Sequence, residues 1–175
     1  MKRILFFCSI LLLGFSNLLR ANSELIIIGS CHVPTKEYNS SVLTDILLKL
    51  EPDLVLIEYD STYFDENWNL IKHYGGLEET VILQVQQKLN IPVRPFDIEG
   101  RSKFYKEHKF QETEKELWDK RNAVMAQNIK KYVQQFPNKR IVVVAGADHR
   151  PYLRKLLISE QNGYILQEYW ELMKN

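Results

Sequence analysis

Residues 25–32 have the sequence LIIIGSCH. Four large apolar residues, three of them β-branched, predict a short strand that is buried on both faces, as interior strands of parallel sheets are. Gly29 ends the apolar run and allows the backbone to turn tightly. This turn is expected to place the side chain of His32 at the carboxyl end of the strand.

The same arrangement returns near the other end of the chain, where residues 142–149 have the sequence VVVAGADH. An apolar run is again followed by a glycine, Gly146, then by two residues and a histidine, His149. Open α/β sheets bind their ligands at the carboxyl ends of the strands. The two segments therefore predict two strand ends that direct His32 and His149 toward one site.

The rest of the chain alternates between the periodicities of strands and helices. Further strands are expected over 54–57, 93–96, 141–145 and 164–166, and helices over 42–50, 78–89, 111–136 and from Pro151 onward. A strand, a helix and a second strand in succession form a βαβ unit, whose crossover is nearly always right-handed. We therefore predict an α/β fold, with a mostly parallel central sheet of about four to five strands and helices on both faces.

The length of 175 residues suits one domain, and a content of 45% apolar and 26% charged residues excludes a disordered or fibrous chain. The amino-terminal segment resembles an export signal, because residues 1–3 carry two positive charges, residues 4–15 are almost wholly apolar and residues 21–23 are small. We expect a signal peptide over 1–23 and a single exported domain, periplasmic or secreted, over 24–175. An uncleaved anchor is the alternative, but the apolar stretch is short for a membrane span of about 20 residues.

Removal of residues 1–23 leaves 20 basic and 22 acidic side chains, a net charge of −2. This balance gives no electrostatic reason to expect nucleic-acid binding or stable association with a membrane after signal cleavage. Cys31 would then be the only cysteine, so no internal disulfide is possible. Its position beside His32 suggests a nucleophile, but neighbouring side chains of an extended chain point apart, which argues against a Cys–His dyad.

The predicted helix over 111–136 carries an anomaly on its apolar face. At about 100° per residue, Arg121 falls near the middle of the arc formed by the large apolar side chains. A guanidinium that faces the core needs a carboxylate partner or an anionic ligand, because an unpaired buried charge is costly. Two interpretations follow: a structural arginine paired with a strand-end carboxylate, or a residue of the site toward which His32 and His149 point.

Glu58 directly follows the predicted strand over 54–57 and can join the two histidines. Two histidines and a carboxylate could bind a divalent metal ion with open positions. Without a metal, the same groups could activate water, with a histidine as the base and Arg121 holding the developing oxyanion. The wide spacing of the three candidate ligands matches no metal-binding motif, so the identity of any metal stays open.

These segments occur in the same order in a known group of proteins. The two GxxH motifs at 29–32 and 146–149, the acid at Glu58 and the helical segment RNAVM at 121–125 resemble the Tiki/TraB/GumN family. That family belongs to a superfamily that also contains erythromycin-esterase-like and ChaN-like proteins. The resemblance spans nearly the whole mature chain, but the segment between Glu58 and Arg121 is much shorter than in typical members.

The resemblance implies an α/β fold with both GxxH motifs at one site. For Tiki-like members it also implies metal-dependent peptidase activity outside the cytoplasm, with His32, Glu58, Arg121, Asn122 and His149 lining the site. Our leading hypothesis is an exported, metal-assisted hydrolase that cleaves a peptide or a small molecule with an amide or ester bond. His32, Glu58 and His149 would hold a divalent metal ion or activate water, and Arg121 and Asn122 would stabilise the developing anion.

Two alternatives stay open. A protein of the ChaN-like type would bind haem or a similar ligand without catalysis, through a histidine or a tyrosine on the iron. A degenerate member of the family would serve only as an interaction domain, and the shortened central segment is the reason to consider this.

Overall fold

The computed structural model describes residues 22–71, 75–108, 113–159 and 163–174, so residues 1–21 of the predicted signal peptide lie outside the described residues. The strands are β1 (Ser23–Ser30), β2 (Leu54–Ile57), β3 (Val93–Pro95), β4 (Arg140–Gly146) and β5 (Tyr164–Gln167). The helices are α2 (Ser40–Leu50), α3 (Leu77–Leu89), α4 (Arg101–His108), α5 (Glu114–Gln135), α6 (Arg150–Ile158) and α7 (Tyr169–Leu172), with a 3₁₀ turn, η1, at Ser61–Tyr63.

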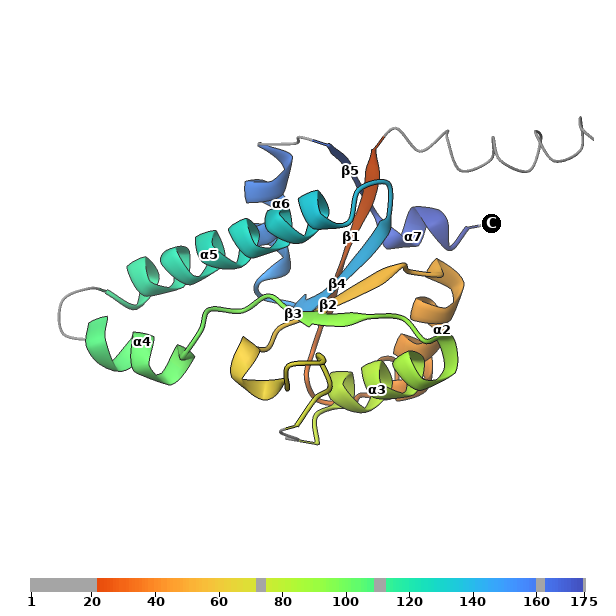
Figure 1. The fold of residues 1–175 in the computed structure, drawn as a ribbon, viewed down its shortest axis with the longest axis horizontal. Helices are drawn as coiled ribbons and strands as arrows, with labels where there is room; N and C mark the ends of the chain where they lie inside the picture. Colours follow the sequence, from red (N-terminus) through yellow and green to blue (C-terminus); the bar gives the residue numbers. More distant parts are fainter. Residues whose placement is uncertain (1–21, 72–74, 109–112, 160–162, 175) are drawn as a thin grey trace, which may run out of the picture.

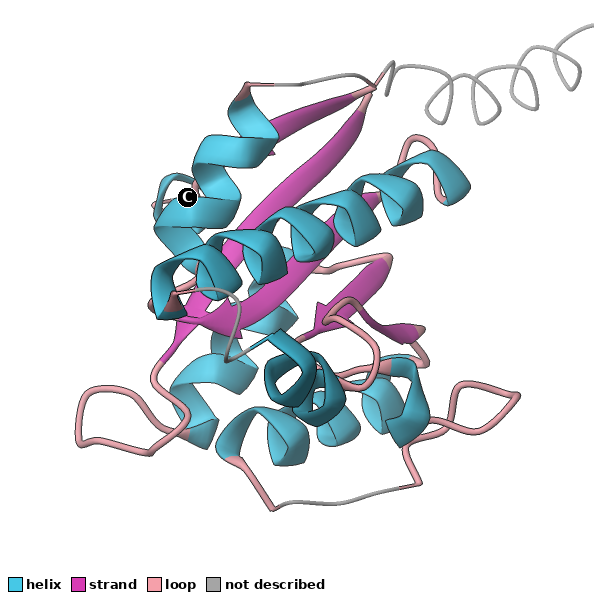
Figure 2. Ribbon diagram, turned by 90° about the vertical axis from the view of Figure 1, so that its left-hand side faces the viewer, coloured by secondary structure: helices cyan, strands magenta, loops and turns pink. Residues whose placement is uncertain are grey.

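The five strands form one sheet in the order β3-β2-β4-β1-β5, and every neighbouring pair is parallel. The three middle strands consist almost wholly of buried residues. Helices cover both faces of the sheet (Figure 1 and Figure 2), which explains why these strands are apolar on both sides. The α/β fold predicted from the sequence is confirmed.

The core has two layers, one on each face of the sheet. Helices α5 and α6 pack on one face, whereas α2 and α3 pack on the other (Figure 1). Successive residues of a strand point to opposite layers, so Ile27 and Val143 face α5 and α6 while Ile26 and Val142 face α2 and α3.

The carboxyl ends of β1 and β4 mark the place where the chain changes faces. The chain leaves β1 toward α2, and it leaves the neighbouring β4 toward α6 on the opposite face. Such diverging connections open a crevice at the carboxyl edge of the sheet, where ligands of open α/β folds bind. His32 follows β1 and His149 follows β4, so both histidines lie at this edge of the sheet.

Several element boundaries differ from those predicted. The long helix begins at Glu114 because Thr113 and Glu116 form a capping box, in which the Thr113 N–H donates to the Glu116 carboxylate at 2.7 Å. Helices α4 and α7 were not predicted, since their short sequences lack an apolar period. Strand β3 is three residues long and lies at the edge of the sheet, where Pro95 is tolerated.

The amino-terminal end of the described chain is an integral part of the sheet. Strand β1 begins at Ser23, one residue before the predicted boundary of the folded domain, and this serine is buried. Its N–H donates to the carbonyl of Gly163 at 3.0 Å. Within residues 22–71, 75–108, 113–159 and 163–174, no helix is both long enough and apolar enough to cross a membrane.

Candidate functional site

The structure brings the five predicted site residues together at the carboxyl edge of the sheet. Glu58 follows β2, His149 follows β4, and Arg121 and Asn122 lie on α5. These four side chains form one network of hydrogen bonds and ion pairs. His32 lies on the outer side of that network, next to Gly146 at the end of β4.

Arg121 is the centre of the network and is only 5% exposed. Its Nε and Nη2 donate to the two carboxylate oxygens of Asp97 at 2.9 and 2.7 Å, and Nη2 also donates to Glu58 Oε1 at 2.7 Å. A two-pronged contact of this kind is the strong form of an arginine–carboxylate pair. Both interpretations of Arg121 therefore apply in part: it is paired with strand-end carboxylates, and this pairing lies within the site.

His149 is buried and held from three sides. Its Nδ1 lies 2.8 Å from Asn122 Oδ1, and its Nε2 lies 3.1 Å from Arg121 Nη1. The ring of Trp118 stacks on the imidazole with centroids 4.1 Å apart and an interplanar angle of 14°. Because Trp118 and Asn122 are one helical turn apart on α5, the same helix face supplies both contacts, and Asn122 Nδ2 also donates to the Trp118 carbonyl. Asn122 thus orients His149.

Glu58 connects the buried network to the outer histidine. Oε1 faces Arg121 and lies 3.4 Å from His149 Nε2, while Oε2 accepts the N–H of Gly146 at 2.6 Å. Burial alone would raise the pKa of the Glu58 carboxyl. Its contacts with His149, the Gly146 N–H and the positive charge of Arg121 outweigh burial and lower this pKa to about 2. Glu58 is therefore a carboxylate at neutral pH.

His32 differs from the other four residues because its side chain is 58% exposed. Its backbone has a left-handed φ of 57°, and its N–H donates to Glu78 Oε1 at 3.0 Å. The same Glu78 oxygen lies 3.2 Å from the ring Nδ1. The hydrogen bond to Glu78 raises the pKa of His32 above its ordinary value of 6.5, against the opposing effect of burial. The contact with Glu78 leaves Nε2 as the ring nitrogen directed at Gly146.

Gly146 allows His32 and Glu58 to approach each other. A Cβ atom at this position would lie 2.7 Å from His32 Nε2 and 3.3 Å from Glu58 Oε2. No side chain could therefore occupy the position without displacing the imidazole. The glycine of the second GxxH motif thus makes room for the histidine of the first motif.

A cavity of about 600 Å³ opens beside this outer part of the site. His32 and Glu58 line it, together with Tyr59, Asp97 and residues of the 100–103 segment that include Arg101 and Lys103. Arg121, Asn122 and His149 do not line this cavity. The predicted site therefore consists of two exposed or partly exposed groups, His32 and Glu58, and a buried support behind them.

Two residues of the site were missed by the sequence analysis. Asp97 follows β3 as Glu58 follows β2, so the rule that strand-end acids converge could have found it. Glu78 is the second residue of α3, far from His32 in sequence, and no local pattern pointed to it.

The geometry bears directly on the expected metal ion. Among the described residues, no group of three or more histidine, cysteine, aspartate or glutamate side chains is arranged to hold a metal. To bind a metal ion, Nε2 of His149 would have to supply a lone pair, but Arg121 Nη1 lies 3.1 Å from this nitrogen. The same guanidinium also contacts Glu58 Oε1, a second expected ligand atom. If the imidazole is neutral, this lone pair accepts from Arg121; if it is charged, no lone pair exists. His32, Glu58 and His149 therefore do not fit one metal ion in this arrangement.

Comparisons with protein-family models, with curated proteins and with solved structures find no match to this chain. The resemblance to the Tiki/TraB/GumN family therefore stays a prediction that rests on the motif residues. The fold and the site together define an α/β protein of the open, parallel type, with a His–Glu–Arg network at the point where its sheet changes face.

Proposed function

We propose that this protein is an exported hydrolase that cleaves an amide or ester bond in a peptide or small molecule, with His32 as the general base. The observation that carries the proposal is the position of His32. Its Nδ1 contacts Glu78, its Nε2 lies against Gly146 beside Glu58, and it lines a cavity of about 600 Å³. A carboxylate that holds one ring nitrogen while the other faces a cavity is the arrangement that general-base histidines use.

In the proposed reaction, Nε2 of His32 removes a proton from a water molecule as the water oxygen attacks the carbonyl carbon. Oε2 of Glu58, which lies against the same glycine, orients this water. The carbonyl becomes an oxyanion, and the tetrahedral intermediate then expels its alcohol or amine, which takes the proton back from His32. No metal ion takes part in these steps.

The cations that face the developing oxyanion in this proposal are Arg101 and Lys103. Both are exposed and line the cavity beside His32. Arg121, which the sequence analysis considered for this role, donates to Asp97 and Glu58 and is buried behind the cavity. Its role in the proposal is to hold Glu58 and His149 in place, and Asn122 holds His149.

Tyr59 gives little support to the alternative of haem binding. Burial and the hydrogen bond from Tyr59 to Glu79 raise the pKa of Tyr59 above its usual value, so this side chain is a poor source of the phenolate that iron prefers. His32 and Tyr63, which also line the cavity, are the other candidate iron ligands there. A haem titration followed at the Soret band separates this alternative from hydrolysis.

The test is hydrolysis of a panel of p-nitrophenyl esters and of aminoacyl and peptidyl p-nitroanilides by the purified protein. His32→Gln should lower kcat/KM by about 10² to 10⁴, the usual contribution of a general base. His108→Gln is the matched control, because His108 lies at the end of α4 with its Nδ1 on the Phe104 carbonyl, outside the cavity. This control should keep the parent rate.

Two results would overturn the proposal. Equal kcat/KM in His32→Gln and the parent would show that His32 is not the general base. Loss of activity in EDTA, with recovery on addition of Zn²⁺ or Mn²⁺, would show that catalysis needs a metal ion after all and that the Arg121–His149 contact rearranges to admit it.

A further inference from the structure

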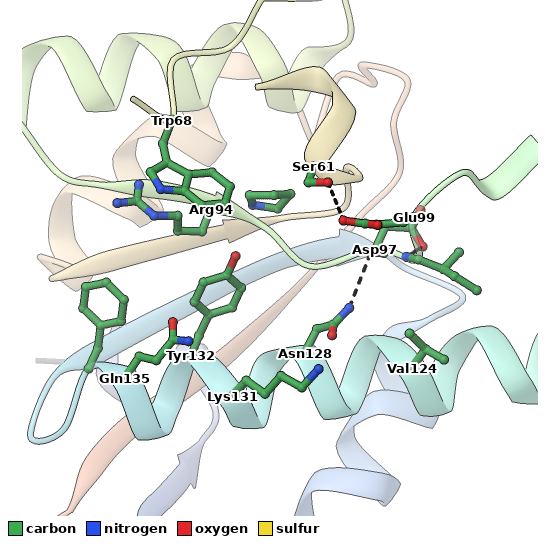
Figure 3. A pocket seen from close by; sticks show the side chains of 13 residues that line it. Ser61, Trp68, Arg94, Asp97, Glu99, Val124, Asn128, Lys131, Tyr132 and Gln135 are labelled. Carbon is green, nitrogen blue, oxygen red and sulfur yellow. Dashed lines mark hydrogen bonds between the residues drawn. The ribbon is translucent and has the colours of Figure 1, made fainter. Parts of the chain in front are cut away.

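A second cavity, of about 730 Å³, lies between β3, the 61–68 segment and α5. Figure 3 shows Trp68 and Arg94 on one side of it and the side chains of α5, among them Lys131, Tyr132 and Gln135, on the other. It shares Asp97 with the cavity beside His32 but contains neither histidine. None of the residues proposed for hydrolysis directs its reacting atoms into it.

Among the described residues, the positive charges of this cavity have no acidic partner. Arg94 is half-buried, and its one hydrogen bond in the described part of the chain runs from Nη1 to the Val93 carbonyl at 2.8 Å. Within the same described ranges, neither Arg94 nor Lys131 forms an ion pair. Burial lowers the pKa of Arg94, which means that the surroundings disfavour its charge. A guanidinium has five N–H donors, so most of those of Arg94 remain for a ligand.

The negative charges of the cavity are directed elsewhere. The Asp97 carboxylate is occupied by Arg121, and Glu99 accepts a hydrogen bond from Ser61 Oγ at 2.6 Å. In Figure 3, Ser61 and Glu99 lie at the opposite end of the cavity from Trp68 and Arg94. An acidic ligand group at Arg94 therefore meets a locally positive surface.

Trp68 is held over Arg94 by a strained turn. The Arg94 guanidinium carbon lies 4.8 Å from the centre of the indole ring, a cation–π contact. Trp68 has a φ of 63°, a left-handed conformation that a bulky residue seldom adopts. Asp65 fixes the turn, since its Oδ1 accepts the N–H groups of Asn67 and Asn69 at 2.9 and 2.8 Å. Strain of this kind persists where the surrounding structure enforces it, and it gathers at ligand clamps.

We propose that this cavity is a binding site for a small organic anion that carries a ring. The carboxylate or phosphate of the ligand accepts hydrogen bonds from Arg94, with Lys131 as a second cation. The ring lies against the apolar wall that Pro95, Tyr132 and Phe136 form. Trp68 covers one face of the guanidinium, fixes its orientation and excludes water from that face. This inference does not depend on the proposed hydrolysis.

The test uses phenyl phosphate and benzoate as probes, titrated by calorimetry into the whole protein, with benzyl alcohol and inorganic phosphate as comparison ligands. Both ring-bearing anions should bind, and benzyl alcohol should not. Arg94→Gln should weaken their binding at least tenfold, and Arg94→Lys by less. Arg154→Gln removes an exposed arginine on α6 that pairs with Glu168, far from this cavity in the fold, and should leave the affinity unchanged. The two probes distinguish a phosphate site from a carboxylate site by their relative affinity.

A nuclear magnetic resonance measurement keeps the inference testable even if Arg94 variants fold poorly. In the parent protein, phenyl phosphate should shift the indole N–H signal of Trp68, identified with Trp68→Phe, and leave that of Trp118 in place. Several outcomes would overturn the inference. These are equal affinities in the parent and in folded Arg94→Gln, absence of binding by both anions, inorganic phosphate binding as tightly as phenyl phosphate, or a shift at Trp118 in place of Trp68.

Discussion

Arg121 shows how one residue can serve both packing and the site. Its position on the apolar face of α5 would be destabilising without partners, and three partners surround it: Asp97, Glu58 and His149. Burial of such an ion pair costs desolvation energy that offsets much of the attraction between the charges. The main consequence of the pair is therefore that it fixes the positions of the side chains that form it. Because Arg121 contacts the acids that follow β2 and β3, it fixes the relative placement of two strand ends.

The contribution of Asp97 can be measured by Asp97→Asn. The amide nitrogen of the variant would face a nitrogen of Arg121 and leave the guanidinium with one carboxylate partner. We expect the free energy of unfolding, measured in urea, to fall by roughly 3 kcal/mol, as it does when one partner of a buried pair is removed. Asp119→Asn is the control, because Asp119 pairs with Lys115 on the exposed surface of α5, where solvent screens the pair, so the loss of stability should be much smaller. Equal losses in the two variants would show that Arg121 does not need Asp97.

The pair of His32 and Glu78 makes a second prediction at this scale. Glu78→Gln removes the charge that raises the pKa of His32, so the pKa should fall toward 6.5. The acid limb of kcat/KM should move to lower pH with it, because a base with a lower pKa is free at lower pH. Glu79→Gln is the matched control, since the neighbouring Glu79 accepts a hydrogen bond from Tyr59 and does not contact His32 in the described structure. The titration midpoint of His32 can be followed by the nuclear magnetic resonance signal of its Cε1–H. An unchanged midpoint in Glu78→Gln would contradict the role of Glu78 in raising the pKa of His32.

At the scale of elements, Gly29 and Gly146 have different structural roles, although they occupy matching places in the GxxH motifs. Gly29 is the next-to-last residue of β1, whereas Gly146 is the last residue of β4. A Cβ on Gly29 would lie 3.2 Å from the Cα of Ala147 and from Cδ of Arg150, so it would press on the backbone of the other motif. A Cβ on Gly146 would meet the far end of His32, a largely exposed side chain that can move aside.

Two alanine variants separate these roles. Gly29→Ala should lower the free energy of unfolding by about 1 to 3 kcal/mol, the usual cost of overpacking. Gly146→Ala should change stability by less and lower kcat/KM by about 100-fold, because displacement of a reacting group by about 1 Å costs that much. Chemical denaturation and the ester assay give the two readouts. If Gly146→Ala keeps full activity, the close approach of His32 to this glycine has no part in catalysis.

The same elements show what the sequence could predict. Strands β1, β2 and β4 were found because they are continuous apolar runs, and helices α2, α3 and α5 because their apolar residues recur at helical spacing. The strand-end rule predicted that His32, Glu58 and His149 follow β1, β2 and β4, and the structure has them there. Helix α4 was missed because the segment Arg101–His108 is mostly polar, and it carries two cations of the cavity. The partnership of His32 with Glu78 could not be predicted, since it depends on how α3 packs beside the end of β1, which no local pattern encodes.

At the scale of the whole molecule, the hydrogen-bonded network around Arg121 connects elements that backbone hydrogen bonds do not join. Strands β2 and β4 are paired in the sheet. Helix α5 packs on one face of that sheet, and the side chain of Arg121 joins it to Glu58 after β2 and to Asp97 after the edge strand β3. Glu58 is the common member, bound to α5 through Arg121 and to β4 through the Gly146 N–H. Its ionisation should therefore affect the stability of the entire fold.

The sign of this effect follows from the pKa of Glu58, which falls from 4.5 to about 2 in the folded protein. A carboxyl group whose pKa is lower in the folded state than in the unfolded state stabilises the protein at pH values above its unfolded-state pKa. This contribution is lost as the pH falls toward the folded-state pKa. The difference in free energy of unfolding between the parent and Glu58→Gln should thus be largest above about pH 4.5, near 3 kcal/mol, and shrink between pH 4.5 and 2. Urea unfolding at a series of pH values measures it, and the comparison with Glu58→Gln removes the effect of every other acid. A difference independent of pH would mean that Glu58 is not held as a carboxylate by Arg121 and Gly146, and the buried support of the site would then need a different electrostatic account.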